Sequence, residues 1–426
     1  MLIFAVVLLA VLVCLAIPVA AILGVLGLSL NAAFSSMPLW RAMGEVSWNA
    51  STEYMLVAIP LYILLGEIFL RTGIAEDMYA ALSKWVSWLP GGLMHANIAS
   101  CTLFAATSGS SVATAATIGT LALPQQKKYG YNERMFLGSI AAGGTLGILI
   151  PPSINMIIYG VLTNASIPQL YVAAVVPGII LAVLFSATIF LRSRFSIEWT
   201  REVVVRASWE ERLRSLKYLL PPLFICLVII GSIYSGLATP TESAGLGVVA
   251  VMVLALARRN LNWPMLAVAF ESTMRTTGMI MLIIIFAYVL NFVLSGVGLT
   301  GEVNSFMTNL GLSPLATILA VVAFYLVLGC FMETLSMMIA TIPIVAPVVF
   351  AAGYDPIWFG VVMMILVELA MITPPIGVNL YVVQGIRQSG DISDVIIGVT
   401  PFILAMLVLI GLLIAFPQIA MFLLVR

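Results

Sequence analysis

Two short polar clusters interrupt stretches of the sequence that are otherwise apolar. The first is Thr107–Ser111, with the letters TSGSS, and the second is Met332–Ser336, with the letters METLS. Hydroxyl, carboxylate and freed carbonyl oxygens suit a hard cation such as sodium. Helix N-termini beside them would offer N–H groups and the positive end of a helix dipole to an anion. These residue types predict paired sites for a small cation and a small anion.

Two pairs of consecutive prolines supply a second kind of break. Pro151-Pro152 and Pro374-Pro375 each lie within a long apolar stretch. Proline has no N–H and its ring clashes with the carbonyl one turn earlier, so two in succession should unwind a helix and free its carbonyls. A simple kink is the alternative. The polar candidates at the clusters and the breaks are Ser108, Ser110, Ser111, Thr145 and Asn155 in the first half and Glu333, Thr334, Thr373 and Asn379 in the second.

The composition indicates which elements must position these residues. Of 426 residues, 62% are hydrophobic and 8% are charged, whereas soluble domains carry about 25% charged residues. Most of the surface must therefore face lipid, and a net charge of zero argues against a nucleic-acid partner. Full crossings are predicted near 2–30, 53–70, 133–165, 169–191, 217–236, 242–257, 266–294, 356–386 and 395–424.

The polar clusters lie in the middle of the apolar regions 92–124 and 313–350. A span broken at mid-depth survives only where its bare backbone is buried in protein or lines a wet cavity. We therefore predict that each region is a re-entrant helical hairpin with its tip near the membrane centre. An ordinary helix with a Ser/Gly packing face is the alternative. The short segments 72–90 and 297–312 precede the hairpins, and we expect them to lie along the two membrane faces.

The same features recur at one constant separation of 223 positions. The matched pairs are Gly73 and Gly296, Pro124 and Pro347, Gly130-Tyr131 and Gly353-Tyr354, and Pro151-Pro152 and Pro374-Pro375. At that spacing Ser110 of the first cluster stands opposite Glu333 of the second. One gap-free offset over this distance indicates an internal duplication, which is the usual construction of a secondary transporter.

The basic residues predict how the two copies are oriented. The loop 192–217 is rich in Lys and Arg, and the positive-inside rule places it in the cytoplasm. Counting crossings outward puts 16 of the 18 basic residues on that side and leaves Arg41 and Arg426 outside, if each hairpin enters and leaves by one face. The letters QQKK follow the first hairpin and the uncharged VVFA occupies the matching place in the second. The hairpins therefore open to opposite faces, and the repeats are inverted.

The predicted fold is an all-α polytopic membrane protein with two inverted repeats, each holding a re-entrant hairpin and a Pro-Pro-broken transmembrane helix. The stretch 2–30 lacks the basic start of a signal peptide and is interpreted as a retained first helix, which places the N-terminus in the cytoplasm and the C-terminus in the periplasm. The predicted divisions are 1–52, an N-terminal helix and periplasmic loop; 53–215, the first repeat with hairpin 92–124 and broken helix 133–165; 216–263, linking helices; and 264–426, the second repeat with hairpin 313–350 and broken helix 356–386.

Carboxylates in apolar surroundings receive different predicted roles. Glu67 and Arg71 have the i,i+4 spacing of a helical ion pair. Glu242 is expected to cap the helix that follows it. Glu368 lies one to two turns before the second proline pair, where a structural role and a role in coupling are equally supported.

Enzyme classes lack the residues that they need. The sequence holds no G-x-x-x-x-G-K-[ST] motif and a single histidine, His95, so a nucleotide site of that type, a His metal cluster and a Ser-His triad are not predicted. We therefore predict that the chain is not an enzyme and carries no organic cofactor. A passive scaffold or channel would gain nothing from costly polar breaks.

In their order along the chain these motifs resemble the large membrane subunit of tripartite ATP-independent periplasmic (TRAP) transporters, the DctM/SiaM-like family. The resemblance runs from Ile59-Pro60-Leu61 to the C-terminus. Its most specific pieces are Ser108–Pro124, Gly147–Tyr159 with the letters PPSIN, Thr239–Glu242 and Thr373–Asn379.

The resemblance implies a function and a mechanism. Members of the family are sodium-coupled importers in the bacterial inner membrane, and they take an organic acid, such as a C4-dicarboxylate or sialic acid, from a soluble periplasmic binding protein. A small Q-type membrane subunit accompanies the large one and is expected here to be a separate polypeptide. The implied motion is an elevator, in which hairpins and broken helices carry the substrate past a scaffold. The alternative is a stand-alone sodium/dicarboxylate symporter or antiporter that needs no binding protein.

Carried over by motif position, the resemblance also assigns roles to residues. Sodium would be held by Ser108, Gly109, Thr145, Gly147 and Pro151 in the first half and by Glu333, Thr373 and Gly377 in the second. The substrate would contact Ser110, Ser111, Asn155, Thr334 and Asn379. At the second tip the family is expected to carry Asp, where this chain has Glu333.

Overall fold

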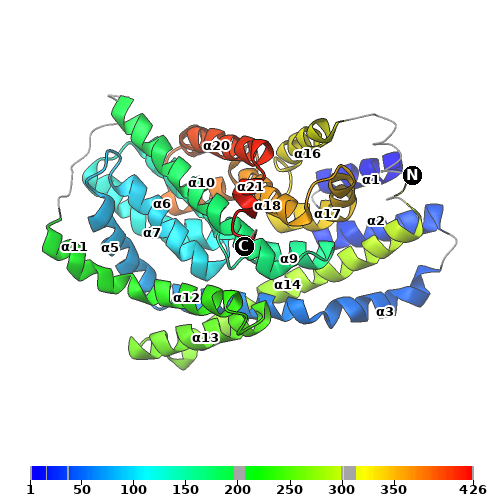
Figure 1. Ribbon diagram of the computed structural model, residues 1–426, viewed down its shortest axis with the longest axis horizontal. Helices are drawn as coiled ribbons and strands as arrows, with labels where there is room; N and C mark the ends of the chain where they lie inside the picture. Colours follow the sequence, from blue (N-terminus) through cyan, green and yellow to red (C-terminus); the bar gives the residue numbers. More distant parts are fainter. Residues whose placement is uncertain are drawn as a thin grey trace.

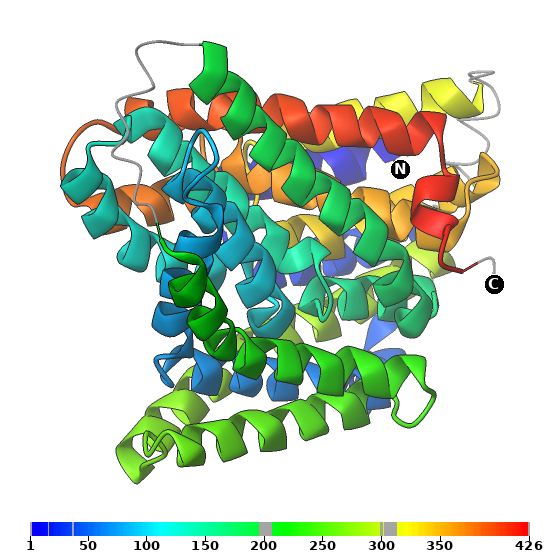
Figure 2. The ribbon, with the colours of Figure 1, turned by 60° about the vertical axis from the view of Figure 1, so that its left-hand side comes forward.

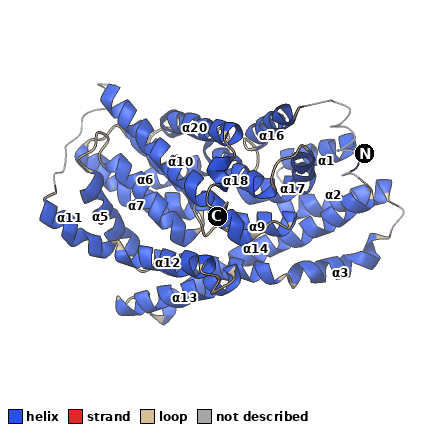
Figure 3. Cartoon of the chain, viewed as in Figure 1, coloured by secondary structure: helices blue, strands red, loops and turns tan. Residues whose placement is uncertain are grey.

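The computed structural model describes residues 2–15, 17–35, 38–195, 207–298, 301 and 313–424. Throughout these residues the regular elements are helices joined by short turns (Figure 3). The predicted all-α class is confirmed. Most of the predicted arm 297–312, together with the basic residues Arg201, Arg206 and Arg426, lies outside the described residues.

The helices fall on either side of a short connection. Before it come α1 (Leu2–Cys14), α2 (Val19–Phe34), α3 (Leu39–Ser51), the 3-10 turn η1 (Tyr54–Val57), α4 (Ala58–Leu70), α5 (Ile74–Val86), α6 (Leu93–Ser108), α7 (Ser111–Tyr129), α8 (Glu133–Leu149), α9 (Ile154–Thr163) and α10 (Ile167–Phe195). The connection contains α11 (Trp209–Ser215) and η3 (Leu216–Tyr218). After it come α12 (Leu220–Tyr234), α13 (Pro240–Ala257), α14 (Trp263–Gly296), α16 (Pro314–Leu328), α17 (Thr334–Ala351), α18 (Pro356–Ile372), α19 (Val378–Arg387), α20 (Ile392–Ala415) and α21 (Gln418–Met421).

Several described helices are long and apolar enough to cross a membrane. By length and composition there are five, namely α10, α13, α14, α17 and α20, or up to eight spans if each of three bent pairs counts as one. The bent pairs are α3 with α4, α8 with α9, and the connection with α12. This content is that of a polytopic membrane protein.

Each predicted hairpin region consists of two helices that meet at the polar cluster. α6 ends at Ser108 and α7 begins at Ser111, with Gly109 between them at a φ of +59°. α16 ends at Leu328, and α17 begins after Glu333. The two helices of each pair contact one another. Entry of each pair from a single membrane face stays a prediction.

The double prolines interrupt the helices in which they lie. α8 ends at Leu149 and α9 begins at Ile154, with a bend of 43° between them. α18 ends at Ile372 and α19 begins at Val378. Both Pro-Pro peptide bonds are cis. The interruptions therefore lie where the sequence places them.

The prediction of one helix over residues 2–30 is wrong. This stretch forms α1 and α2, with Pro18 at the N-cap of α2, because proline lacks the N–H that a continuous helix needs and clashes with the preceding turn. The rings of Phe4 and Phe34 lie 5.5 Å apart, so α1 folds back along α2. The predicted cytoplasmic N-terminus assumed a single crossing and loses that basis.

Helix bounds in the two halves follow the sequence spacing. α8 and α18 both have 17 residues, and they begin at Glu133 and Pro356, which are 223 positions apart. α2 and α13 end at Phe34 and Ala257, again 223 apart. The sequence predicts linking helices over 216–263, and in the structure α13 of this region ends in register with α2. The inverted relation and the domain boundaries stay predictions.

The helices pack in two groups. In one group α14 contacts α2, α3 and α4, α4 also contacts α13, and α13 contacts α12. In the other group α8 packs against α6, α7, α10, α18, α19 and α20. In Figures 1 and 2 the helices α12 and α13 lie at the lower edge, whereas α20 and α10 lie on the opposite side of the molecule. α8 and α20 cross so closely that neither Gly138 nor Gly398 has room for a Cβ atom.

Candidate functional site

A cavity of about 200 Å³ lies between the two polar tips, and we call it the tip cavity. Residues of the first tip, the second tip, α4, α9 and α14 line it together, although they are far apart in the sequence. Its polar and charged lining residues are Glu67, Ser108, Ser110, Ser111, Asn155, Thr276, Glu333 and Thr334. Of the described residues that line it, none is Lys or Arg.

The first tip begins α7 with a neutral cap. Ser110 is the N-cap residue, and its side chain accepts a hydrogen bond from the backbone N–H of Ala113 at 3.3 Å. Thr114 Oγ1 donates to the carbonyl of Ser110 at 2.7 Å and lies 3.1 Å from Ser108 Oγ. Serine is favoured here because its hydroxyl satisfies one of the N–H groups that the first turn leaves free. The remaining N–H groups and the helix dipole make this end suitable for an anion.

The first tip packs tightly on the break between α8 and α9. A Cβ atom on Gly147 would lie 2.7 Å from the backbone of Ser110 and Ser111, and one on Gly109 would lie 2.9 Å from the carbonyl oxygen of Pro152. Ser111 Oγ donates to the carbonyl of Thr145 at 3.3 Å. The residues predicted for the first sodium site are thus brought together, with Gly147 and Thr145 behind the cavity wall and Ser108 and Gly109 in it.

At the first break, Pro151 and Thr145 offer backbone rather than side-chain oxygens. Pro151 immediately precedes Pro152, whose carbonyl oxygen approaches Gly109. Thr145 is fully buried, and its own hydroxyl donates to the carbonyl of Ala142 at 2.7 Å. A cation at this break would therefore meet backbone oxygens and the hydroxyls of the tip.

The second tip begins α17 with a charged cap. Glu333 is the N-cap residue, and its Oε2 accepts from the backbone N–H of Ser336 at 3.2 Å and from Ser336 Oγ at 3.0 Å. Thr334 Oγ1 donates to Oε1 at 3.1 Å. A carboxylate at a helix N-terminus is stabilised by the helix dipole, so the carboxylate of Glu333 already occupies the place that an external anion would take. What it offers to the cavity is negative charge, which attracts a cation.

Asn155 contributes an unpaired donor at the start of α9. Ser153 caps this helix, and its hydroxyl accepts from the backbone N–H of Met156 at 3.4 Å. Asn155 lines the tip cavity and is buried, yet its Nδ2 has no hydrogen-bond partner. A buried donor without a partner is costly. An anionic oxygen in the cavity would satisfy it.

The candidates at the second break do not line the tip cavity. Thr373 Oγ1 donates to the carbonyl of Leu369 at 2.6 Å, and Gly377 lies at the N-cap of α19. Asn379 is fully buried and its Nδ2 donates to the carbonyl of Ala141 on α8 at 3.2 Å. The structure therefore brings together the two tips and the first break, whereas the second break contributes only Met371, at the end of α18.

The structure adds lining residues that the sequence did not indicate. Gly66 of α4 packs against the first tip, where an added Cβ would lie 3.2 Å from the carbonyl of Ser108. Glu67, beside it, forms the predicted ion pair with Arg71 and also lines the cavity. Thr276 comes from the middle of α14. A charged residue within an apolar stretch could have marked Glu67 as a candidate lining residue. No local feature of the sequence marks Thr276 or Gly66 in this way.

The predicted capping role of Glu242 is also confirmed, at a helix start away from the tip cavity. Glu242 forms a capping box with Thr239 at the start of α13: the hydroxyl of Thr239 accepts from the N–H of Glu242, and the carboxylate accepts from the N–H of Thr239. Such reciprocal bonds satisfy two free donors of the first turn. This carboxylate is therefore accounted for by the helix start.

A second, larger cavity of about 950 Å³ borders the second tip. Side chains of α1 and α2 form one wall, and α16 and α17 form the other. Its lining is mostly apolar, with Glu333 and Ser336 at the tip. Glu333 thus lines both cavities, and the larger one lies between the N-terminal helices and the second hairpin.

Comparison with known proteins identifies the family. The family model described as the "Tripartite ATP-independent periplasmic transporter, DctM component" matches residues 6–419. The chain belongs to this family. This large subunit is 32% identical over 382 residues to the C4-dicarboxylate TRAP transporter large permease protein DctM of Pseudomonas aeruginosa, covering 89% of this chain and 88% of that protein.

Other relatives carry different substrate names. The chain is 33% identical to the ectoine/5-hydroxyectoine TRAP transporter large permease protein UehC of Ruegeria pomeroyi, covering 86% of this chain and 85% of that protein. It is 30% identical to the sialic acid TRAP transporter large permease protein SiaM of Vibrio cholerae, covering 86% and 85%. The name of the family therefore does not by itself fix the substrate.

Solved structures of more distant proteins share the fold. The Alcanivorax borkumensis YdaH transporter superposes with a TM-score of 0.60 at 16% identity, covering 94% of this chain and 98% of that one. MtrF of Neisseria gonorrhoeae gives a TM-score of 0.53 at 12% identity, covering 90% and 85%. Together with the family, this makes the chain a multi-pass membrane transport subunit of an inner membrane, and the prediction that it is not an enzyme is confirmed by its family.

Proposed function

We propose that this DctM-family subunit is the permease of a sodium-coupled, binding-protein-dependent importer of a small organic acid. A C4-dicarboxylate or sialic acid, as named for relatives at 32% and 30% identity, is the expected class. The observation that carries the proposal is the tip cavity, where a neutral helix N-terminus and an anionic one face the same space. Such a cavity suits an anion and a cation bound together.

The substrate carboxylate is assigned to the first half. The N-terminus of α7, with Ser110 and Ser111, and the unpaired Nδ2 of Asn155 provide donors in the cavity wall. Among the described lining residues there is no Lys or Arg that could pair with the substrate carboxylate. Backbone dipoles, hydroxyls and the amide therefore bind it, as in other transporters with discontinuous helices. Thr334 would contact the substrate from the second tip.

Sodium is assigned to both halves. The first ion would lie where Ser108 and Gly109 meet the α8–α9 break at Gly147 and Pro151, with the carbonyl of Thr145 close by. The second would lie at Glu333. Thr373 and Gly377 would join this second sodium site, and Asn379 would reach the substrate, after a movement of α19, because all three stand away from the tip cavity in this structure.

An elevator motion accounts for the two helix groups. α8 and its neighbours would move as the transport unit, and α2, α3, α4 and α12–α14 would stay as the scaffold. The apolar cavity of about 950 Å³ between α1–α2 and α16–α17 leaves room on one side of the second hairpin. Inverted repeats would supply the two matching end states.

The proposed orientation keeps the basic loops in the cytoplasm and the C-terminus in the periplasm. Because Phe4 lies beside Phe34, the N-terminus shares the side of the loop before α3, which the charge count places in the periplasm. Single cysteines at Gly130 and Gly353, which follow the two hairpins at matched positions, would test this. Labelling of residue 130 from inside and residue 353 from outside is expected, and labelling from one side would refute inverted repeats.

The proposed partners are a separate small Q-type membrane subunit and a soluble periplasmic binding protein. The decisive experiment reconstitutes this chain with its small subunit in liposomes and imposes an inward sodium gradient, with and without the binding protein. Uptake of a radiolabelled organic acid that needs both is the expected result. Sodium-driven uptake without the binding protein would indicate a stand-alone symporter, and uptake indifferent to sodium would refute the cation sites.

A further inference from the structure

Glu368 joins the two halves of the molecule at a point that the proposed mechanism leaves unused. It lies on α18 and is fully buried. Its Oε1 accepts hydrogen bonds from the backbone N–H groups of Ile148, at 3.0 Å, and Leu149, at 2.8 Å. These two residues form the last turn of α8, immediately before the first break. A carboxyl from the second half thus binds the backbone of the first.

Both N–H groups have a second acceptor within their own helix. In an α-helix the N–H of residue i bonds to the carbonyl of residue i−4, which for Ile148 and Leu149 means Gly144 and Thr145. Because Oε1 of Glu368 shares these N–H donors, it weakens the hydrogen bonds from them to the carbonyls of Gly144 and Thr145. The carbonyl of Thr145 already receives the hydroxyl of Ser111 from the first tip. That contact places this carbonyl beside the first tip, where the first ion is proposed to lie.

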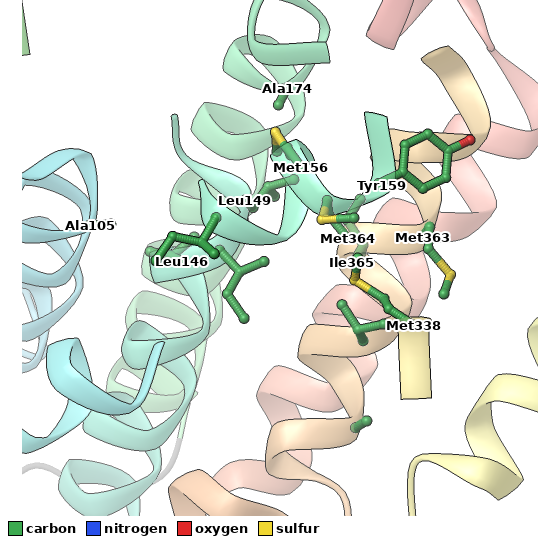
Figure 4. Packing of buried hydrophobic residues seen from close by; sticks show 14 of the residues in the cluster. Ala105, Leu146, Leu149, Met156, Tyr159, Ala174, Met338, Met363, Met364 and Ile365 are labelled. Atoms are coloured by element: carbon green, nitrogen blue, oxygen red, sulfur yellow. The ribbon is translucent and has the colours of Figure 1, made fainter. Parts of the chain in front are cut away.

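The surroundings make this contact specific. Figure 4 shows the apolar packing where α8, α9 and α18 meet, with Leu149, Met364 and Ile365 among the labelled side chains. Oε2 of Glu368 is buried and has no hydrogen-bond partner. The corresponding position of the first half, 223 residues earlier, is Thr145, whose hydroxyl stays within α8 by donating to Ala142. At the first break, the carboxyl of Glu368 from the second half binds the end of α8. At the second break, the matching residue of the first half is Thr145, which has no carboxyl group.

We propose that Glu368 is a positioning residue that, as a hydrogen-bond acceptor, sets the end of α8 in the conformation that presents its carbonyl oxygens to the first ion. The inference rests on the proposed sodium coupling. It assigns no ligand role to Glu368 itself, because the bonded atoms are backbone N–H groups. It also links the second half directly to the first site, because α18 and α8 belong to the same proposed transport unit.

The test compares Glu368→Gln with Glu368→Met. Gln keeps an acceptor oxygen at the place of Oε1, and Met has a similar length but no strong acceptor. In the reconstituted complex with small subunit and binding protein, Met should raise the sodium concentration for half-maximal uptake by about 10–100-fold, the range seen when groups that orient metal ligands are lost. Gln should stay within about twofold, and the substrate KM at saturating sodium should change little in either variant.

Other outcomes decide against the proposal. If Gln is as impaired as Met, the charge or a proton on Glu368 is what matters, and the acceptor role is refuted. Wild-type behaviour of the Met variant would refute any role. Should the Met variant fail to fold, Glu368→Asp replaces it, because the shorter side chain cannot reach both N–H groups; a wild-type sodium response in that variant would equally overturn the inference.

Hydrogen exchange separates this inference from the proposed function. Amide exchange of Ile148 and Leu149 should be faster in Glu368→Met than in wild type and unchanged in Glu368→Gln, with or without sodium. If wild-type uptake proves independent of sodium, the coupling assignment fails, while the exchange result still decides whether the carboxyl holds the end of α8. Equal exchange in all three proteins would refute the positioning role.

Discussion

The two hairpin tips occupy equivalent positions and differ in one decisive respect. Ser110 and Glu333 are 223 residues apart, each is the N-cap of the second helix of its pair, and each accepts from the backbone N–H three residues on. One cap is neutral and the other is a carboxylate. The same local architecture therefore presents a positive helix end at the first tip and a negative group at the second.

This difference indicates how a single cavity can hold ions of opposite sign. At the first tip the helix dipole is uncompensated, so an external anion gains from it. At the second tip the dipole stabilises Glu333, and the carboxylate attracts a cation. Under the proposed function, the choice of capping residue would give the two tips separate tasks, with the anion at Ser110 and the cation at Glu333.

Making the first tip resemble the second should have the largest effect. Ser110→Glu would place a carboxylate at the end of α7, where the substrate anion is proposed to bind, and like charges brought together in an interface cost several kcal/mol. We expect the substrate KM to rise by more than about 100-fold. Uptake assays over a range of substrate concentrations would measure this, with Ser110→Gln as a control of similar size without charge. Equal loss in both variants would mean that volume, not charge, distinguishes the tips.

Making the second tip resemble the first is the reciprocal change. Glu333→Ser keeps a capping hydroxyl and removes the charge, so α17 should remain intact while the sodium concentration for half-maximal uptake rises by about 10–100-fold. Uptake at varied sodium, beside the melting temperature of the purified protein, would check both parts. An unchanged sodium response would remove Glu333 from the cation site.

The packing behind the tips offers a weaker but clean contrast. Gly147 faces the backbone of the first tip, whereas the matched position 223 residues later is Ala370, which packs on Gly329. Gly147→Ala should overpack this contact and destabilise the protein by about 1–3 kcal/mol, measured as a lower melting temperature and slower uptake. The matched control Ala370→Gly should cost about 1 kcal/mol through helix propensity and leave sodium dependence unaltered. A wild-type uptake rate in Gly147→Ala would contradict a special role for the first break.

Removing the neutral cap should have the smallest effect. Ser110→Ala leaves the N–H of Ala113 without its side-chain acceptor, and loss of such a cap costs about 1 kcal/mol. We expect a severalfold rise in substrate KM with little change in sodium dependence, read from the same uptake assays. A shift in sodium dependence alone would place Ser110 in the cation site. Combined with Glu333→Ala, the change should abolish uptake while expression persists.

Local chemistry allowed much of this fold to be predicted. A single proline such as Pro177 stays within a helix, but each pair of consecutive prolines removes two N–H groups and clashes with the preceding turn. The C-terminal ends of α8 and α18, just before Pro151 and Pro374, follow from these pairs. The i,i+4 pair of Glu67 and Arg71 and the capping box at Glu242 are likewise decided within one or two turns. Pro18 is a single proline within a long apolar run, so the sequence pattern predicts one helix there, whereas the structure ends α1 before it and begins α2 after it.

The candidate site was harder to predict, as the two asparagines after the double prolines illustrate. Asn155 and Asn379 follow similar letters, yet Asn155 lines the tip cavity and Asn379 is bonded to Ala141 of α8. From the sequence pattern, both asparagines are expected to contact the substrate. Their difference arises from which helices pack beside α9 and α19, and that is a property of the assembled molecule.

The sequence by itself determined that this chain is a helical membrane protein, because a surface that faces lipid demands apolar residues. It also determined where the helices are interrupted, because the two polar clusters and the two proline pairs each cause a break at their own position. Tertiary structure decided that α1 folds back on α2, that Glu67 and Thr276 reach the cavity, and that Glu368 binds the end of α8. Each of these contacts joins a helix to another that local rules leave unspecified, Glu368 and Ile148 being 220 residues apart. Packing between distant helices fixes such contacts, since the burial of whole helix faces outweighs any preference of a single turn.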